Sequence, residues 1–485
     1  MFSEHMSHEK AQVGSLQKLE SVLLDNFAFE PTESQQDVIH ALPRFLLSSK
    51  KNCLFILRGY AGTGKTSIVN ALVKSLHLLN SYAVLMAPTG RAAKVLSSYS
   101  NQSASTIHRK IYHQQRTASG GVFFVPAHNP HKNVLFIIDE ASMIGWENYS
   151  LGKAGNLLED LLEYTFSGRN CKVLLIGDSA QLPPVGSSQS PALDLDFLKS
   201  HFELTAASFE LTDVMRQKEN SGILNLATLL RMYIFGQMES LPILLESTAD
   251  CKLITGYDLQ EELETSFSQY GEEGTVIICR SNKRSYAFNM QVRARVFFRE
   301  EIIDAGDYIM AVKNNYKWLD KDSSAGFIAN GDIMEVLSVS TFEERYGFSF
   351  ARASVRLIDY PKEPELEILL WLDALDVESA SLSKSATDKL YREVTKDYEH
   401  LATKAERKKA LQNDEFYNAL QVKYAYAVTA HKAQGGQWPS VFVDQGYLTE
   451  DMIDAEYYRW LYTAVSRATT ELKLVNFSTE LILEN

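Results

Sequence analysis

A glycine-rich run at residues 58 to 67, RGYAGTGKTS, lies between the apolar stretch CLFIL and a stretch with a helical pattern. The run matches the pattern G-x-x-x-x-G-K-[ST] at every fixed position. In such a loop the glycines let backbone N–H groups surround phosphate oxygens, the lysine reaches the β and γ phosphates, and the last hydroxyl can coordinate Mg²⁺. The chain must therefore place this loop between a buried strand and a helix. The residues expected at the phosphates are Gly59, Gly62, Thr63, Gly64, Lys65 and Thr66, and Thr66 is also a candidate Mg²⁺ ligand.

Short apolar runs recur along the chain before turns and helical patterns, as is typical of buried parallel strands. A first series lies at residues 53–59, 82–89, 133–140 and 172–178, and a second at 274–282, 424–435, 440–445 and 471–478. The pattern predicts an α/β chain with two domains of this kind.

Two stretches interrupt this rhythm. Residues 109 to 131 carry a Ser-Gly-Gly turn between short strand patterns, which predicts an inserted β-hairpin. Residues 303 to 420 show short β patterns and then, from 381, charged helical ones, which fit a small β-barrel with a helical projection or a solvated helical hairpin without a role. The expected boundaries are 1–108 and 132–205 for the first domain, 109–131 for the hairpin, 206–302 and 421–485 for the second domain, and 303–420 for the barrel.

The composition bears on the possible partners, on membrane segments and on the state of the cysteines. The net charge of −13 does not exclude a nucleic-acid partner, because phosphate binding depends on local basic clusters. No apolar run approaches the roughly 20 residues of a membrane helix, so we expect a cytoplasmic protein without a membrane segment. The cysteines are widely spaced without a CxxC pair, which favours buried free thiols over a zinc site; they are Cys53, Cys171, Cys251 and Cys279.

Two adjacent carboxylates, Asp139 and Glu140, follow the apolar run VLFII. An isolated pair of this kind is more often a helix cap or a solvated acid. Because this pair follows a complete phosphate loop in the chain, we expect the two acids to have different roles. Asp139 would orient Mg²⁺ through water, and Glu140 would be the general base.

Three further side chains fit the same chemistry. Gln181, in GDSAQLPPVG, offers a neutral amide suited to sensing the γ-phosphate. Arg216 in LTDVMRQ and Arg467 in YTAVSRAT can neutralise the charge that develops during phosphoryl transfer.

Taken in order, these motifs resemble superfamily 1 helicases of the 5′-to-3′ branch, of the RecD and Dda type. The matching segments are GYAGTGKTS, APTGRAAKVL, STIHRKIY, IIDEASM, GDSAQLPPVG, LTDVMRQ, AYAVTAHKAQGGQWPSVFVD and LYTAVSRAT, within about Thr32 to Thr470. The resemblance implies two RecA-like P-loop NTPase domains that bind ATP between them and single-stranded DNA across their tops. It implies that Gln35, in PTESQ, contacts the adenine, and that Gln434 and Gly435 link the DNA groove to the nucleotide.

The resemblance also implies a set of DNA contacts. These are Pro88, Thr89, Arg91, Thr106 and His108 in the first domain, and Asn282, Thr429, His431 and Lys432 in the second. His108 alone would more often be a structural histidine, and an Asn after a strand, such as Asn282, is often a turn former. In the family the hairpin is a pin that splits the duplex, with Phe123 or Phe124 as base-stacking wedges here unless they pack beneath the hairpin.

The remaining segments fit the same family. The barrel resembles the SH3-like domain of this branch, and the helices at 381–420 resemble the tower of Dda-like members. The adenine-reading element begins by residue 32, so we expect a compact Dda-like architecture without the extended N-terminal region of RecD.

The function expected is an ATP- and Mg²⁺-dependent DNA helicase that moves 5′ to 3′ on single-stranded DNA and opens duplex junctions. We expect a monomer, with single-strand-binding, replication or recombination proteins as candidate partners. A DNA-bound protein-remodelling translocase and an RNA helicase are the alternatives. The first would not need a rigid pin, and competition between DNA and RNA strands would identify the second.

Overall fold

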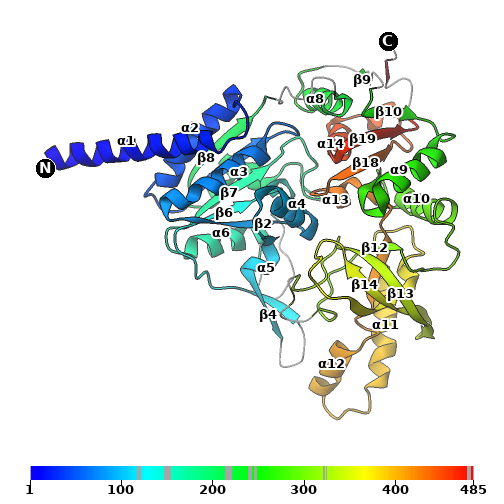
Figure 1. Ribbon diagram of the computed structural model, residues 1–485. Coiled ribbons are helices and arrows are strands. Elements are labelled where there is room, and N and C mark those ends of the chain that lie inside the picture. The colour runs from blue at the N-terminus through cyan, green and yellow to red at the C-terminus, as the bar shows by residue number, and fades with distance from the viewer. Residues whose placement is uncertain are drawn as a thin grey trace. The chain divides into compact units, whose positions relative to one another are not determined.

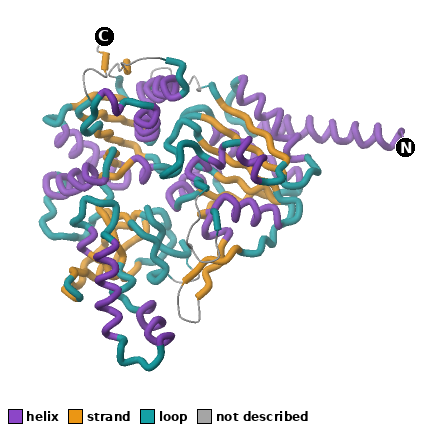
Figure 2. Tube along the Cα trace, turned by 180° about the vertical axis from the view of Figure 1, so that it is seen from behind, coloured by secondary structure: helices purple, strands orange, loops and turns teal. Residues whose placement is uncertain are grey.

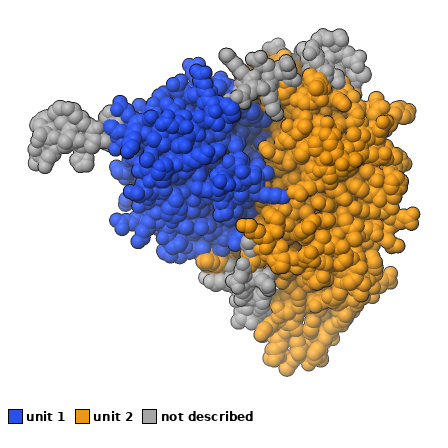
Figure 3. All heavy atoms as spheres, viewed as in Figure 1, with its two compact units in different colours: residues 1–88, 92–112, 126–219 blue, residues 89–91, 113–125, 220–485 orange. Residues whose placement is uncertain are grey.

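The computed structural model describes residues 2–116, 122–146, 155–213, 221–238, 243–244, 248–319, 323, 325–477 and 482–483. The chain divides into two compact units, shown in separate colours in Figure 3. The first unit comprises residues 1–88, 92–112 and 126–219, and the second comprises 89–91, 113–125 and 220–485.

The first unit is built on a six-stranded sheet in the order β3-β2-β6-β7-β1-β8, in which every neighbouring pair is parallel. Its strands are β1 (Cys53–Gly59), β2 (Tyr82–Ala87), β3 (Ala104–Thr106), β6 (Val134–Ile138), β7 (Lys172–Gly177) and β8 (Thr205–Leu211). All five residues of β6 and all six of β7 are buried, as expected for central strands covered on both faces. The first series of apolar runs is therefore confirmed as strands.

Helices cover both faces of this sheet (Figure 1). They are α1 (Phe2–Asp25), α2 (Glu33–Leu47), α3 (Lys65–Ser75), α4 (Gly90–Ser100), α5 (Ile107–Ile111), α6 (Leu157–Ser167) and α7 (Leu195–His201). On one face, Phe55 and Leu57 of β1 share a core with α2 and α3. On the other, Phe136 of β6 packs against Tyr164 of α6 with ring centroids 5.9 Å apart. The sheet thus holds the phosphate loop between two packed layers.

The first unit continues beyond the boundary expected at residue 205. Strand β8 begins at Thr205 and pairs with β1 along seven residues, so these residues belong to the first sheet and the unit extends to Glu219. The sequence pattern missed β8 because TAASFEL is less apolar than the other strands and only its last residue is buried.

The expected hairpin is present as a two-stranded sheet of β4 (Tyr112–Arg116) and β5 (Val122–Pro126). Its residues 113–125 group with the second unit. Phe124 is only 4% exposed and packs against Tyr316 and Phe327, with ring centroids 5.4 and 5.8 Å away. An aromatic cluster therefore fixes this hairpin at its β5 strand.

The second unit contains a parallel five-stranded sheet in the order β10-β19-β18-β11-β17. Its strands are β10 (Cys251–Ile254), β11 (Thr275–Cys279), β17 (Ala427–Thr429), β18 (Trp438–Asp444) and β19 (Ala468–Val475). Its helices are α8 (Gly222–Ile234), α9 (Leu259–Gly274), α10 (Asn282–Arg295), α13 (Ala430–Ala433) and α14 (Ala455–Val465), and β9 (Ile243–Leu244) pairs with β20 (Ile482–Leu483). The second series of apolar runs is confirmed.

The expected barrel is a closed one of five strands. They are β12 (Tyr308–Ala311), β13 (Ile333–Arg345), β14 (Phe348–Leu357), β15 (Leu366–Trp371) and β16 (Leu420–Tyr424). One hydrophobic core runs from the second sheet, at Ile277 and Phe442, into the barrel, at Ile309 and Leu370. The barrel is therefore continuous with the sheet that carries it.

The helical projection lies between β15 and β16 and consists of α11 (Lys384–Asp397) and α12 (Lys404–Asn413), seen beside the barrel in Figure 2. Leu390 and Val394 of α11 and Leu411 of α12 are buried in a cluster with Phe350 and Trp371 of the barrel. The projection is therefore packed on the barrel rather than being a fully solvated hairpin.

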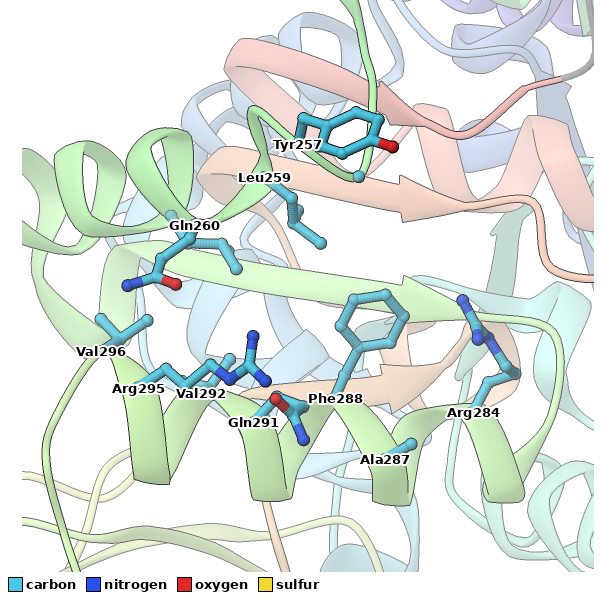
Figure 4. A pocket seen from close by; sticks show the side chains of 12 residues that line it. Tyr257, Leu259, Gln260, Arg284, Ala287, Phe288, Gln291, Val292, Arg295 and Val296 are labelled. Carbon is cyan, nitrogen blue, oxygen red and sulfur yellow. The ribbon is translucent and has the colours of Figure 1, made fainter.

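The second unit also carries a groove of 390 Å³ between α9 and α10 (Figure 4). Its apolar floor includes Leu263, Phe288 and Val292, while Tyr257 at its rim is 98% exposed. Arg284, at one end, is held by the buried carboxylate of Asp444 through two hydrogen bonds of 2.9 and 2.6 Å.

The structure bears on the cysteines and on membrane helices. All four cysteines are buried and none forms a disulfide, as expected. Among the residues that the structure describes, no helix has the length and apolar character needed to cross a membrane.

A buried ionic cluster joins α10 to the start of the barrel. The Asp307 carboxylate is inaccessible to solvent and accepts hydrogen bonds from Arg293 Nε at 2.9 Å and Arg299 Nη1 at 2.6 Å. Tyr426 Oη donates to the same oxygen at 3.0 Å, while Arg293 Nη2 and Asp304 N donate to the other at 2.9 and 2.8 Å. Removing the carboxylate would leave Arg293 and Arg299 with the less buried Asp304 and Glu272 as counter-ions.

We expect Asp307→Ala to lower the free energy of unfolding of the barrel by roughly 3–5 kcal/mol, because it removes the one fully buried counter-ion that Arg293 and Arg299 share. Urea-dependent hydrogen exchange of the β12 and β16 amides measures this change. The control is Glu393→Gln, which breaks an exposed pair with Lys396 and should cost less than about 1 kcal/mol. Equal effects of the two variants would contradict the structural importance of the cluster.

Candidate functional site

The candidate residues of the first unit gather at one edge of its sheet. The phosphate loop follows β1, Pro88 follows β2, Thr106 ends β3, Asp139 follows β6 and Gln181 follows β7. Because these strands are parallel, their carboxyl ends meet at the same edge, where open α/β sheets bind their ligands.

The phosphate loop takes the conformation that its glycines permit. Gly62 and Gly64 have φ angles of 77° and 87°, in the left-handed region where a side chain is unfavourable. A Cβ atom at Gly59 would lie 2.8 Å from Thr63 Oγ1. α3 begins directly at Lys65 and has no acidic residue in its first turn, so its N-terminal amides can face an anion.

Lys65 lies back on the loop that precedes it. Its Nζ donates hydrogen bonds to the carbonyl oxygens of Gly59 at 2.6 Å and Tyr60 at 2.9 Å. Two neutral acceptors hold the ammonium without cancelling its charge, so it can turn to a phosphate. Thr66, the candidate Mg²⁺ ligand, is exposed in the first turn of α3.

Gln35 is fully buried at the start of α2, beside the phosphate loop. Its Nε2 donates to the carbonyl of Thr63 at 2.9 Å, and its Oε1 accepts from Thr32 N at 3.0 Å. These bonds brace the loop and use one N–H and one acceptor position of the amide.

Asp139 is fixed by donors on both carboxylate oxygens. Tyr99 Oη donates to Oδ2 at 2.5 Å, and Glu140 N donates to Oδ1 at 2.9 Å. A carboxylate offers about four acceptor positions, so lone pairs remain for water bound to Mg²⁺. Mg²⁺ keeps several of its waters in such sites, and this donor set fits the outer-sphere role expected for Asp139.

Glu140 adopts a left-handed backbone, with φ 52° and ψ 37°. This conformation is uncommon for a residue with a long side chain and often marks a functional position. It turns the Glu140 N–H onto Asp139, while the Glu140 carbonyl accepts from Met143 N at 3.0 Å.

Arg467 is buried in the second unit at the amino end of β19. It donates to the carbonyls of Thr463 at 3.1 Å and Gly436 at 3.3 Å, and to Ser466 Oγ at 2.9 Å. Gly435 has a φ of 74°, and its neighbour Gln434 is buried. Arg467 is thus connected to the segment expected to link DNA and nucleotide. Arg216 lies outside the described residues.

Two of the expected DNA contacts in the first unit have local structural partners. The Thr106 hydroxyl caps α5 by accepting from Arg109 N at 3.4 Å. Burial lowers the pKa of His108 to about 4. His108 is therefore neutral at physiological pH and could bind a phosphate only as an uncharged donor.

The remaining expected DNA contacts are distributed along strand ends and short helices. Pro88 and Thr89 are half-buried, and Arg91 stacks on Trp438 with its Cζ 4.0 Å from the ring centroid. Asn282 is exposed as the first residue of α10, where Ser281 supplies the N-cap.

The TAHK segment surrounds the start of α13. Thr429 is its N-cap residue and is half-buried, and His431 is exposed. Lys432 donates to the Asn330 side chain, and burial lowers its pKa to about 8.

The two candidate wedge residues of the hairpin differ. Phe124 is buried in the aromatic cluster, and the side chain of Phe123 lies outside the described residues.

Three polar contacts near the site were not predicted. Tyr99 reaches Asp139, Tyr60 Oη donates to Glu210 at 2.7 Å, and Ser34 donates to Asp213 from both N and Oγ. Burial and the Asp139 carboxylate raise the pKa of Tyr99, so its hydroxyl stays a donor. The Tyr99 contact joins segments 40 residues apart and leaves no local pattern in the sequence.

Comparisons with known proteins agree with this arrangement. The model of an AAA domain matches residues 32–233, which include the first sheet, and that of the UvrD-like helicase C-terminal domain matches residues 424–475, which include β17, β18 and β19. This chain belongs to the 5′-to-3′ DNA helicases of superfamily 1.

Individual relatives are more distant. An uncharacterized protein of Acanthamoeba polyphaga mimivirus is 23% identical, covering 86% of this helicase and 94% of that protein. The ATP-dependent DNA helicase Dda of Enterobacteria phage T4 is 24% identical over 66% of this chain and 70% of its own length. The ATP-dependent RecD2 DNA helicase of Deinococcus radiodurans is 33% identical over 36% of this chain, but only 21% of its own length is covered.

Solved structures of similar proteins include the Pif1 helicase from Bacteroides in complex with ADP-AlF3 and single-stranded DNA. It is 16% identical, with 94% of this helicase and 95% of that chain covered and a TM-score of 0.48.

The lowered pKa of His108 gives a prediction for acid stability. A histidine in the unfolded chain titrates near about 6.5, so between that pH and about 4 the unfolded state binds a proton that folded His108 does not. The free energy of unfolding therefore falls as the pH is lowered through this window.

Between pH 7 and pH 4.5, we expect the free energy of unfolding to fall less in His108→Gln than in the wild type. The two decreases should differ by about 2–3 kcal/mol. Urea unfolding at the two pH values measures the difference. Replacing an exposed histidine, His77→Gln, is the control. An identical acid loss in wild type and His108→Gln would show that His108 titrates normally in the folded protein.

Proposed function

We propose that this helicase hydrolyses ATP at the phosphate loop to move 5′ to 3′ along single-stranded DNA and to separate the duplex ahead of it. The observation that carries the proposal is the complete phosphate loop at the carboxyl edge of the first sheet. Lys65 is held there only by neutral carbonyls, and Asp139 and Glu140 follow β6 at the same edge. Such an edge provides both phosphate binding and water activation.

Each nucleotide role is assigned to a named side chain. The loop amides and Lys65 bind the phosphates, and Glu140 accepts the proton of the attacking water as general base. Gln181 senses the γ-phosphate, and Arg467 with Arg216 neutralises the charge that develops on it. Gln35 holds Thr63 in place and contacts the adenine.

Thr66 and Asp139 would hold Mg²⁺, Thr66 by its hydroxyl and Asp139 through water. The bound ion would supply charge neutralisation at the β and γ phosphates. Among the described residues, no group of three or more His, Cys, Asp or Glu side chains is placed to hold a metal. The ATP phosphates therefore have to contribute ligands, as is common for Mg²⁺.

The DNA contacts proposed are sequence-tolerant. Backbone phosphates would be bound by Thr89 and Arg91 at the start of α4 and by His108 of α5. Thr429 at the end of β17 and Lys432 of α13 would bind others. Contacts to phosphate and sugar fix the position of a strand without selecting its sequence, as a moving enzyme requires. The hairpin of β4 and β5 would act as the pin, braced by Phe124 against the barrel.

The test of this function is strand separation on partial duplexes with a 5′ or a 3′ single-stranded tail, with ATPase measured alongside. We expect opening from the 5′ tail only, and strand-stimulated ATPase. Stimulated ATPase without opening from either tail would instead support a protein-remodelling translocase. Opening from the 3′ tail alone would contradict the polarity.

We expect Lys65→Ala to abolish ATP hydrolysis while binding of a labelled single strand stays close to wild type. The ammonium neutralises phosphate charge, whereas the strand contacts lie on other elements. The control is Lys74→Ala, which removes an exposed lysine from the last turn of the same helix. Equal turnover of Lys65→Ala and wild type would disprove the assigned nucleotide site.

We expect Glu140→Gln to bind ATP with near-wild-type affinity and to lose turnover by at least about 100-fold, because the amide cannot accept a proton from water. Equilibrium binding of a fluorescent nucleotide and single-turnover hydrolysis separate the two effects. Glu159→Gln, an exposed acid in the first turn of α6, is the control. Loss of ATP binding by Glu140→Gln would contradict the role as base.

A further inference from the structure

Tyr99 makes a short polar contact that the assigned roles do not use. Its hydroxyl donates to Asp139 Oδ2 at 2.5 Å, within the range of charge-assisted O–H···O⁻ bonds. The ring packs against the apolar core that α2 and α3 share with the first sheet. The hydroxyl is therefore anchored by packing as well as by its acceptor.

The contact fixes the Asp139 carboxylate in space. With Tyr99 on Oδ2 and the Glu140 amide on Oδ1, the carboxylate plane cannot rotate without breaking one of the two bonds. An acid that binds Mg²⁺ through water does not touch the ion. It acts by its charge and by accepting hydrogen bonds from the bound water, so the direction of its lone pairs matters. Partners of this kind typically contribute 10–100-fold in metal affinity or activity.

Tyr99 also connects Asp139 to a helix with a different task. α4 runs from Gly90 to Ser100, with Arg91 in its first turn and Tyr99 in its last. An α-helix of eleven residues spans roughly 16 Å, and its backbone hydrogen bonds connect the turn of Arg91 to that of Tyr99. Displacement of its first turn by a DNA strand would therefore be transmitted to the hydroxyl on Asp139.

We propose that Tyr99 is a positioning residue, which orients Asp139 for Mg²⁺ and transmits the position of α4 to it. This rests on the proposed function, because it takes Asp139 as the acid that holds Mg²⁺ and Arg91 as a DNA contact. The step adds no chemistry of its own, since the hydroxyl keeps its proton throughout.

The variant that tests it is Tyr99→Phe, which removes only the hydroxyl. A matched control exists in the same unit, where Tyr112 Oη donates to the buried Asp160 carboxylate at 2.6 Å. Tyr112→Phe thus deletes an equivalent Tyr–Asp bond away from the phosphate loop. Thermal unfolding of both variants establishes that each is folded.

The first readout is binding, without turnover. Fluorescent ADP is titrated at increasing Mg²⁺ concentrations, and we expect Tyr99→Phe to raise the half-saturating Mg²⁺ concentration about tenfold, with no change for Tyr112→Phe. In an Asp139→Asn background, Tyr99→Phe should cause no further change in the half-saturating Mg²⁺ concentration, because Asp139→Asn already removes the interaction through which Tyr99 acts. An unchanged Mg²⁺ dependence in the single variant would overturn the positioning role.

The second readout is the ratio of ATPase with a saturating single strand to ATPase without it. We expect this ratio to fall in Tyr99→Phe and to be retained in Tyr398→Phe, which deletes a Tyr–Asp bond of 2.8 Å in the helical projection. An unchanged ratio would overturn the link to α4. If the wild type hydrolysed no ATP, the proposed function would fail, while the Mg²⁺-dependent binding of ADP would still decide whether Tyr99 orients Asp139.

Discussion

The hydrogen bonds from Lys65 Nζ to the carbonyls of Gly59 and Tyr60 form only because the first sheet and α3 place these residues together. They require β1 to end at the edge of a parallel sheet and α3 to begin at the next residue after the left-handed Gly64. Because β1 lies between β7 and β8, the loop is also fixed laterally by strands buried under helices. The phosphate loop is thus positioned by the whole sheet rather than by its own sequence.

Charge is distributed in this helicase in a way that its net value of −13 conceals. Burial lowers the pKa of two expected DNA contacts, His108 to about 4 and Lys432 to about 8. A neutral donor holds a phosphate less tightly than a full charge does, whereas a lysine with a pKa of about 8 is still mostly protonated at neutral pH. The two expected contacts therefore differ in charge.

Residues adjacent in sequence were predictable, and contacts between distant segments were not. β1 spans residues 53–59, as the apolar run predicts, and the phosphate loop and the Asp139–Glu140 pair lie at strand ends as expected. The boundary at 205 was wrong because β8 is held by pairing with β1, not by its own hydrophobicity. The packing of Phe124 on Tyr316 and the bond from Tyr99 to Asp139 arise only in the folded chain.

The backbone at Glu140 provides an independent argument for a working carboxylate there. A left-handed conformation costs a residue other than glycine about 1–2 kcal/mol, and Glu140 adopts it with a φ of 52°. Glycine would keep both backbone hydrogen bonds of this turn, from its N–H to Asp139 and from Met143 N to its carbonyl, without that strain. The turn alone would therefore favour glycine. A glutamate at this position is consistent with the proposed role of its side chain as the base that activates water.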